Sequence, residues 1–425
     1  MNEHNHQYKI QTNKFCWYCI STLFVVILIL LNLEGQYNQC LAICVLFYSA
    51  LSVIKSRKNW YLLIIEITLL FCNYSIVGPN YLFHINSSFF EFSNDPVGAL
   101  GLNILLGFTV MNYIFAPSVA DKNQEKPITS EGRYNPIIII GFLALLSLIW
   151  FFGFTRPTAV GGRGTPTAIY EYSIVFIIIG FYYTGNKIWA KICITFAAIM
   201  FAMQNFIYGG RITGVQLILC IVMCLFIDKI SVRKVVIAAT VGLPVMTGIG
   251  SDRGSFALTL ASFTNSVQNI FGGKLTLDTA YSAYYTSLTF LKAKEYTEFG
   301  RRMYMFKQFL LSLILGGSVI DSNLPDYTRT TFMHYWGGVT PYYAYFYLGI
   351  VGVFLISLYI GFLKKQIRDK DTKSDFIRCM SIYVVATTFR WYLYAPTQIL
   401  RGILLLWFVF TVARLFHSIS GQKAI

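Results

Sequence analysis

Residues 332–349, FMHYWGGVTPYYAYFYLG, end the longest stretch of the chain that is neither an apolar run nor a short connector. That stretch extends from Gly250 to Thr340 and also contains the turn-like sequence Gly250-Ser-Asp-Arg253-Gly254. On both sides of it, long apolar runs follow one another with short connectors between them. We therefore predict a hydrophobic scaffold that holds the segment 250–340 at one face of a bilayer.

The composition indicates a membrane protein. Hydrophobic residues make up 56% of the chain and charged residues 12%, and the mean hydropathy is +0.57. A soluble protein is about one-quarter charged. Charge-free runs repeatedly reach the roughly 18 to 20 residues that a helix needs to cross the hydrocarbon core. The predicted fold class is an all-α polytopic membrane protein, and we expect no nucleic-acid partner.

The apolar runs predict about twelve transmembrane helices. Their ranges are 15–33, 37–54, 60–78, 97–116, 136–154, 172–184, 188–206, 212–227, 235–249, 341–363, 376–394 and 398–416. The chain thus divides into helices 1–9 with short loops (1–249), one large loop with interfacial helices (250–340), and helices 10–12 with the C-terminus (341–425). The apolar segment 307–318 is too short to span, so we predict an interfacial or re-entrant helix there.

The distribution of Lys and Arg predicts the orientation, because short cytoplasmic loops carry the excess of positive charge. With the N-terminus inside, the inner segments hold most of the basic residues, including Lys55, Arg57 and Lys58 and a cluster from Lys364 to Arg378. Both termini are therefore expected in the cytoplasm, and the large loop outside.

The basic residues of the short outer connectors are all arginines: Arg156, Arg163, Arg211, Arg390 and Arg401. An arginine stays charged in any environment and presents a planar fork of donors that suits phosphate oxygens. In the alternative interpretation, these arginines lie at helix ends and only extend their side chains toward the membrane–water interface. We favour an anion site on the outer face.

Three outer arginines lie beside glycines, in Gly161-Gly162-Arg163-Gly164, Gly209-Gly210-Arg211 and Gly250-Ser-Asp-Arg253-Gly254. Glycine lets the backbone approach a ligand closely, although it is also the common turn residue. Arg211 stands where a span begins, and the free amides of a helix N-terminus attract anions. A lipid diphosphate is the membrane-embedded anion that this pattern fits.

His334 is the histidine that the large outer loop contains, and it lies among Tyr335, Trp336 and two glycines. A histidine near neutral pH can accept a proton from a sugar hydroxyl, and aromatic rings stack on sugars. The same aromatics are expected in an interfacial belt. Because His334 lies among them, we favour a functional site. The sequence Asp326-Tyr-Thr-Arg329 lies shortly before His334.

Carboxylates do not form a metal site in this sequence. The first outer loop offers only Glu34, and the acidic residues of the large loop include no adjacent pair and no histidine at ligand spacing. We therefore expect no metal and no cofactor. Glu66 lies inside the third predicted span, where it either lines a polar pathway or pairs with a base of the Lys55–Lys58 cluster; a structural role is favoured.

The chain resembles the O-antigen polymerases of the Wzy type, within the wider superfamily of O-antigen polymerases and ligases. The similarity covers the whole architecture: about twelve spans, cytoplasmic termini and one large late outer loop. It also covers Gly209-Gly210-Arg211 at the start of a span, and His334-Tyr-Trp-Gly-Gly followed by Pro341-Tyr-Tyr-Ala-Tyr-Phe-Tyr-Leu-Gly349.

The resemblance implies a metal-independent glycosyltransferase of GT-C-like architecture at the periplasmic face of the bacterial inner membrane. Its donor and acceptor would be oligosaccharides linked to undecaprenyl diphosphate, and a chain-length regulator would be a further partner. An acceptor hydroxyl would attack the donor's anomeric carbon, and the lipid diphosphate would leave.

Within that mechanism, His334 and Arg211 are the expected catalytic residues. Arg163, Arg211 and Arg253 would neutralise the leaving diphosphate, and His334 would orient or deprotonate the acceptor hydroxyl. The expected substrate-binding residues are Arg156, Arg163, Arg253, Arg329, Tyr335 and Trp336.

Two other functions remain open from the sequence. An O-antigen ligase would use the same donor but would transfer it to lipid A–core. A flippase or transporter of lipid-linked oligosaccharides would share the span count, but no repeat between the two halves of the chain is detectable.

Overall fold

The structure is a computed structural model that describes residues 2–83, 96–118, 125–157, 164–208, 210–231, 233–235, 237, 278–317, 319–334, 337–370, 374–394 and 396–422. Within these ranges the chain is almost entirely helical. A two-stranded antiparallel sheet pairs β1 (Phe154–Thr155) with β2 (Thr165–Pro166), and Phe154 lies opposite Pro166.

The helices are α1 (Asn2–Leu31), α2 (Asn38–Ser56), α3 (Trp60–Val77) with the π-helical turn η1 (Gly78–Leu82), α4 (Pro96–Phe115), α5 (Ile128–Glu131), α6 (Pro136–Phe152), α7 (Ala168–Glu171), α8 (Ser173–Thr184), α9 (Ile188–Ile207), α10 (Arg211–Leu225) with the 3₁₀ turn η2 (Ile227–Lys229), α13 (Asp278–Tyr296), α14 (Phe299–Leu315), α15 (Leu324–Arg329), α16 (Thr340–Leu348), α17 (Ile350–Arg368), α18 (Asp375–Ala386), α19 (Thr388–Leu393) and α20 (Thr397–Gln422).

The chain is an all-α membrane protein, as its composition predicts. Among the described residues, 6 helices are long and apolar enough to cross a membrane: α2, α3 with η1, α4, α9, α17 and α20. Four shorter apolar helices lie at Trp17–Leu31, Pro136–Phe152, Ser173–Thr184 and Arg211–Leu225. Nine of these ten segments coincide with predicted spans, and the tenth, α17, overlaps only the second part of the predicted span 341–363. The predicted span 235–249 lies outside the described residues except for 235 and 237.

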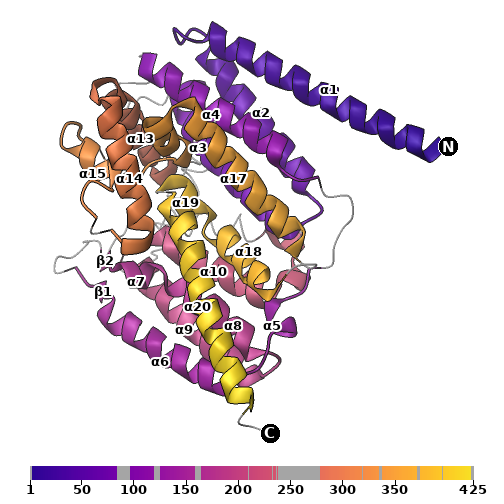
Figure 1. Cartoon of the computed structure of the whole chain (residues 1–425), viewed down its shortest axis with the longest axis vertical. Helices are drawn as coiled ribbons and strands as arrows, with labels where there is room; N and C mark the ends of the chain where they lie inside the picture. The colour runs from indigo at the N-terminus through magenta and orange to yellow at the C-terminus, as the bar shows by residue number, and fades with distance from the viewer. Residues whose placement is uncertain are drawn as a thin grey trace.

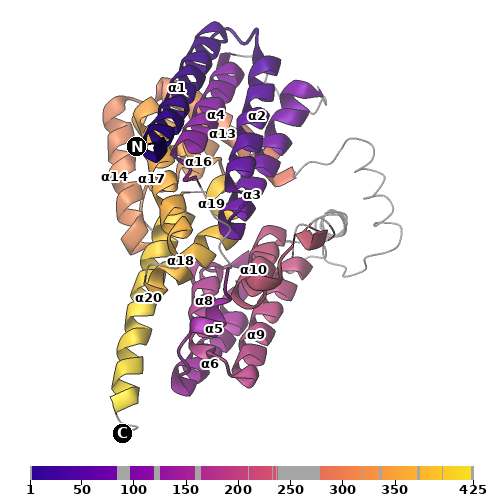
Figure 2. The same ribbon diagram turned by 90° about the vertical axis from the view of Figure 1, so that its right-hand side faces the viewer.

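Two groups of helices build the molecule (Figure 2). The first contains α1–α4 with α13, α14, α16 and α17, and the second contains α5, α6 and α8–α10. α18 packs against α3 of the first group and against α8 and α10 of the second. In Figure 1 the long helices α1, α17 and α20 slope downward to the right. Along that direction, both ends of the chain and α5 lie at one side of the molecule, and β1, β2, α7 and α15 lie at the opposite side.

Two of the predicted spans are not continuous helices. The predicted helix 341–363 breaks at Gly349, whose φ of +65° and ψ of −147° are accessible mainly to glycine. The predicted helix 376–394 breaks at Thr387. The hydroxyls of Thr387 and Thr388 donate to carbonyls of α18, which offers the backbone an alternative to a continuing helix. The second break makes α19 a separate short helix.

Glu66 is fully buried and has a structural role, as its position predicts, but its partner is not in the Lys55–Lys58 cluster. Lys364 Nζ on α17 donates to Glu66 Oε1 at 2.6 Å and to Asn112 Oδ1 at 2.9 Å. The side chains of Lys364 and Glu66 are 1% and 2% exposed. An unpaired charge is costly inside a membrane, so separating Lys364 from Glu66 is unfavourable. The contact of these two residues and Asn112 therefore holds α3, α4 and α17 together.

Candidate functional site

A buried arginine on α19 connects three helices at the side of the molecule where α7 lies. Arg390 is 8% exposed. Its Nη2 donates to Glu171 Oε1 on α7 at 2.5 Å, and its Nη1 donates to Thr213 Oγ1 on α10 at 3.0 Å. The guanidinium also lies 5.5 Å from the centre of the Tyr394 ring. We call Arg390, Glu171, Thr213, Gln398 and Arg401 the arginine cluster.

The remaining members come from α20. Gln398 Nε2 donates to Glu171 Oε2 at 3.5 Å, and Arg401 Nη2 donates to the carbonyl of Ser312 on α14 at 2.5 Å. Nε of Arg390 and Nε of Arg401 are buried atoms without a hydrogen-bond partner in the described structure. Buried N–H groups in proteins are nearly always paired. The cluster therefore retains donors that a bound anion could use.

Local structure places Glu171 in this cluster. The Thr167 hydroxyl caps α7 by accepting from the Tyr170 amide, and it donates to the carbonyl of Gly153 at 3.0 Å. The β1–β2 pairing immediately precedes α7 and fixes the same connector. The short helix thus ends with Glu171 directed at Arg390.

Arg211 begins α10, the helix that also carries Thr213 of the arginine cluster two residues further along. Its side chain is half-buried. The N-cap residue is Gly210, so no side chain caps the first turn of α10. The first turn of α10 thus contains both the predicted arginine and Thr213, the residue that bonds to Arg390.

His334 is buried, with 9% of its surface exposed, and its Nε2 lies 2.9 Å from the Thr328 hydroxyl of α15. The Thr328 hydroxyl itself donates to carbonyls of α15. This bond holds the imidazole of His334 against α15.

Residues 337–343 pack directly on the end of α19. The amide of Gly338 donates to the carbonyl of Leu393 at 3.0 Å, and Gly337 has a φ of +101°. A Cβ at Gly337 would lie 2.9 Å from that same carbonyl, which is too close for a side chain. The Tyr343 hydroxyl donates to the carbonyl of Tyr394 at 2.7 Å. The glycines of the predicted motif are needed for this approach to the helix that carries Arg390.

The other predicted site residues do not belong to the buried cluster. Arg156 follows β1 and Arg329 ends α15, and both side chains are exposed. The predictions for Arg163, Arg253, Tyr335 and Trp336 lie outside the described residues.

Glu171, Arg390 and Arg401 were not predicted as site residues from the sequence, although Arg390 and Arg401 are among the arginines of the short outer connectors. One signal was available: a charge within or at the edge of an apolar run is costly unless it has a partner or a function. Arg390 lies inside the run 376–394, and Glu171 directly precedes the run 172–184.

An apolar groove of about 200 Å³ lies beside the arginine cluster. Its walls come from α14, α16, α17 and α20, and include Phe306, Phe309, Tyr343, Tyr347, Ile356 and Leu400. Leu400 directly precedes Arg401, and Tyr343 is bonded to the residue that covers Arg390. A polar, positively charged region thus adjoins an apolar one, the arrangement that an amphiphile with an anionic head requires.

Comparisons of the chain with models of protein families, with curated proteins and with solved structures find no match.

Proposed function

We propose that this chain polymerises oligosaccharide repeat units, linked to undecaprenyl diphosphate, into O-antigen or a related surface polysaccharide. The observation that carries the proposal is the arginine cluster with its spare donors beside an apolar groove. The cluster suits a diphosphate, because guanidinium groups bind its oxygens, and the groove suits the first isoprene units of the lipid.

In the proposed reaction, a hydroxyl of the acceptor unit attacks the anomeric carbon of the donor. A carbon–oxygen bond to the acceptor forms, and the bond to the diphosphate oxygen breaks with its electron pair. Arg390, Arg401 and Arg211 stabilise the charge that develops on the leaving diphosphate. Glu171 holds Arg390 in place. His334 orients or deprotonates the acceptor hydroxyl, and the binding of two substrates side by side supplies further acceleration.

The proposal includes a GT-C-like architecture with about twelve spans in the bacterial inner membrane, both termini in the cytoplasm and the site at the periplasmic face. In support, both ends of the chain lie at one side of the molecule and the α7 and α15 regions lie at the other (Figure 1). A chain-length regulator is a further partner in this proposal.

The test is the lipopolysaccharide banding pattern of a deletion strain complemented with variants. The set is wild type, Arg390→Gln, Arg401→Gln, Arg211→Ala and His334→Ala. Arg301→Gln is the matched control, because Arg301 is an exposed arginine that pairs with Asp321 at 2.9 Å outside the cluster. Immunoblots of membranes establish that each variant is present at the wild-type level.

A polymerase predicts that the ladder collapses to core plus one repeat unit in the deletion, and that wild type and Arg301→Gln restore it while the cluster variants do not. Core with no unit at all would indicate a ligase or a flippase and overturn the proposal. A full ladder in Arg390→Gln and Arg401→Gln would remove the cluster from the mechanism.

A further inference from the structure

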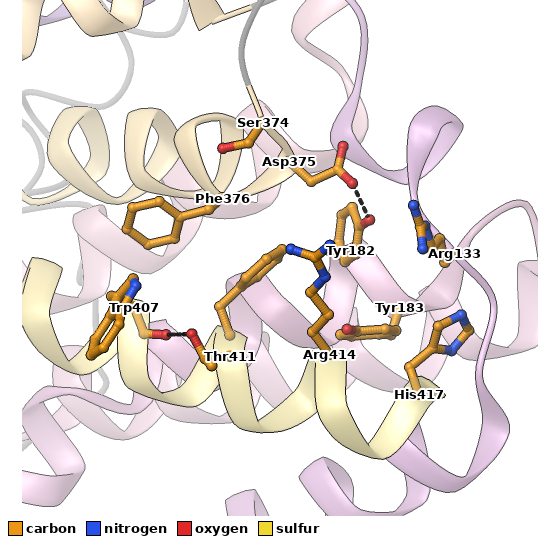
Figure 3. Close-up of a pocket in the computed structure, with 11 residues that line it drawn as sticks. Arg133, Tyr182, Tyr183, Ser374, Asp375, Phe376, Trp407, Thr411, Arg414 and His417 are labelled. Atoms are coloured by element: carbon orange, nitrogen blue, oxygen red, sulfur yellow. Dashed lines mark hydrogen bonds between the residues drawn. The ribbon is translucent and has the colours of Figure 1, made fainter. Parts of the chain in front are cut away.

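A second polar site lies far from the arginine cluster, at the side of the molecule where the C-terminus and α5 lie. It is a cavity of about 410 Å³ between α8, α18, α20 and the segment before α6 (Figure 3). The proposed polymerisation does not use it.

Two arginines give this cavity its charge. Arg133 comes from the segment between α5 and α6, and Arg414 comes from α20. In the view of Figure 3 the Tyr182 hydroxyl lies between the two guanidinium groups. Among the described residues, no carboxylate forms an ion pair with either arginine.

The acid that lines the cavity, Asp375, is already engaged. Its Oδ2 accepts from the Tyr182 hydroxyl at 2.7 Å, and its Oδ1 lies 4.0 Å from Nη1 of Arg378. The lining therefore carries an excess of positive charge, which favours an anion.

His417 on α20 is oriented by Asn135. The Asn135 side-chain oxygen accepts from the amides of Ile137 and Ile138, so its NH₂ group faces His417 Nδ1 at 3.0 Å. Nδ1 must then be the acceptor, which leaves the N–H of the neutral ring on Nε2. The imidazole thus contributes a donor of fixed orientation beside the two guanidinium groups.

The surroundings favour a lipid over a soluble anion. α20 is one of the helices able to span a membrane, and the cavity lies toward its C-terminal end. Trp407, which lines the cavity, is 56% exposed, so an amphiphile can approach from the bilayer. Tryptophan is typical of the headgroup level of membranes, and basic pockets between transmembrane helices bind phosphate headgroups.

We propose that this cavity binds the phosphate headgroup of an anionic phospholipid of the surrounding bilayer, with Arg133 and Arg414 on the phosphate and the glycerol and upper acyl chains against Trp407. The site is independent of the proposed catalytic activity, and its test needs no turnover.

The experiment measures the thermal unfolding midpoint of the purified full-length protein in detergent during titration with phosphatidylglycerol, phosphatidylcholine or inorganic phosphate. The test variant is Arg133→Gln/Arg414→Gln. The matched control is Lys191→Gln/Arg233→Gln, which removes the same charge from basic residues that do not line the cavity. Arg133→Lys/Arg414→Lys keeps the charge and serves if the first variant is unstable without lipid.

We expect phosphatidylglycerol to stabilise the wild type and the control, with an apparent affinity about thirtyfold weaker in the Arg133→Gln/Arg414→Gln variant, since each basic residue at an anionic surface contributes about fivefold. The lysine variant should keep most of the binding. Three results would overturn the proposal: no stabilisation of the wild type by phosphatidylglycerol, equal stabilisation by phosphatidylcholine or inorganic phosphate, or an equal loss in the control.

Discussion

The Lys364–Glu66 pair is fully buried, whereas the Arg390–Glu171 pair is partly exposed through Glu171, and the hydrogen bonds of the two pairs also differ. Lys364 bonds to Glu66 and Asn112, and its side chain is 1% exposed. Arg390 bonds to Glu171 and Thr213, but its Nε is unpaired in the described structure, and the Glu171 side chain is 26% exposed. The neighbouring Arg401 also has an unpaired Nε.

This difference separates a structural ion pair from a candidate binding site. A buried pair whose charges are fully compensated holds helices together and has nothing to offer a ligand. A cluster with two arginines, one carboxylate and spare N–H donors retains positive potential and hydrogen-bonding capacity. Removing charges from each region should therefore affect stability in the first and activity in the second.

The largest effect is expected for Lys364→Met. The substitution leaves the Glu66 carboxylate buried and unpaired, which costs about 3–5 kcal/mol. Protein yield and the unfolding midpoint in detergent measure it. The double variant Glu66→Leu/Lys364→Met should recover most of the loss, because no charge remains to be buried. If the double variant were as unstable as the single one, packing of Lys364 rather than charge would explain the effect.

For the arginine cluster, Arg401→Gln should lower the rate of polymer formation about 10²–10³-fold, the effect of removing one preorganised donor to a developing anion. The unfolding midpoint should change little, because the hydrogen bond that holds the Arg401 guanidinium goes to a backbone carbonyl, that of Ser312, and not to a buried charge. Polymer formed per unit time in membranes with equal protein content is the measurement. If the unfolding midpoint of the variant fell enough to explain the loss of polymer, Arg401 would have a structural role, as Lys364 has.

Glu171→Gln should separate the two ion pairs in a second way. The amide oxygen can still accept from Arg390, so the stability loss should be about 1 kcal/mol, the difference between a charged and a neutral hydrogen bond. The cluster would then carry one more net positive charge, so its affinity for a lipid diphosphate should rise. Binding of undecaprenyl diphosphate to the purified variant tests this. In Glu66→Gln, by contrast, stability should fall without any gain in binding.

The smallest effect concerns Lys294, a half-buried cation on α13 outside the six candidate spans. Its Nζ lies 3.5 Å from the centre of the Tyr345 ring. Burial, with a smaller effect of the Arg302 charge, lowers the pKa of Lys294 from 10.5 to about 8. The unfolded chain therefore binds more protons between these two values, so stability should rise with pH across this window.

Lys294→Met should remove that rise, and at about pH 7 it should unfold at a slightly higher temperature than the wild type. The difference between the two unfolding midpoints, measured at several pH values, is the test. Parallel curves would mean that Lys294 is not destabilised by its surroundings.

Much of the fold follows from local sequence. Apolar runs predicted nine of the described apolar helices, from 15–33 to 398–416, because the length of an apolar run decides whether a helix can cross a bilayer. The breaks at Gly349 and Thr387 were missed. Both lie within predicted spans, and a backbone break depends on φ, ψ and hydroxyl bonds that hydropathy does not record.

The candidate site was predicted only in part. The glycines after His334 pack on the helix that carries Arg390, and Arg211 shares the first turn of α10 with Thr213, which bonds to Arg390. Arg156 and Arg329 are exposed. The sequence showed an excess of arginines in the outer connectors, but it did not show which of them lie close together in the fold.

By itself, then, the sequence determined the membrane class, the positions of most helices and the kinds of charge at each side. Only the tertiary structure decided which charges pair. Arg390 meets Glu171 across 219 residues and Lys364 meets Glu66 across 298. Hydrophobicity is a property of each segment and can be summed along the chain. An ion pair depends on how two distant helices pack, and no local pattern contains that information.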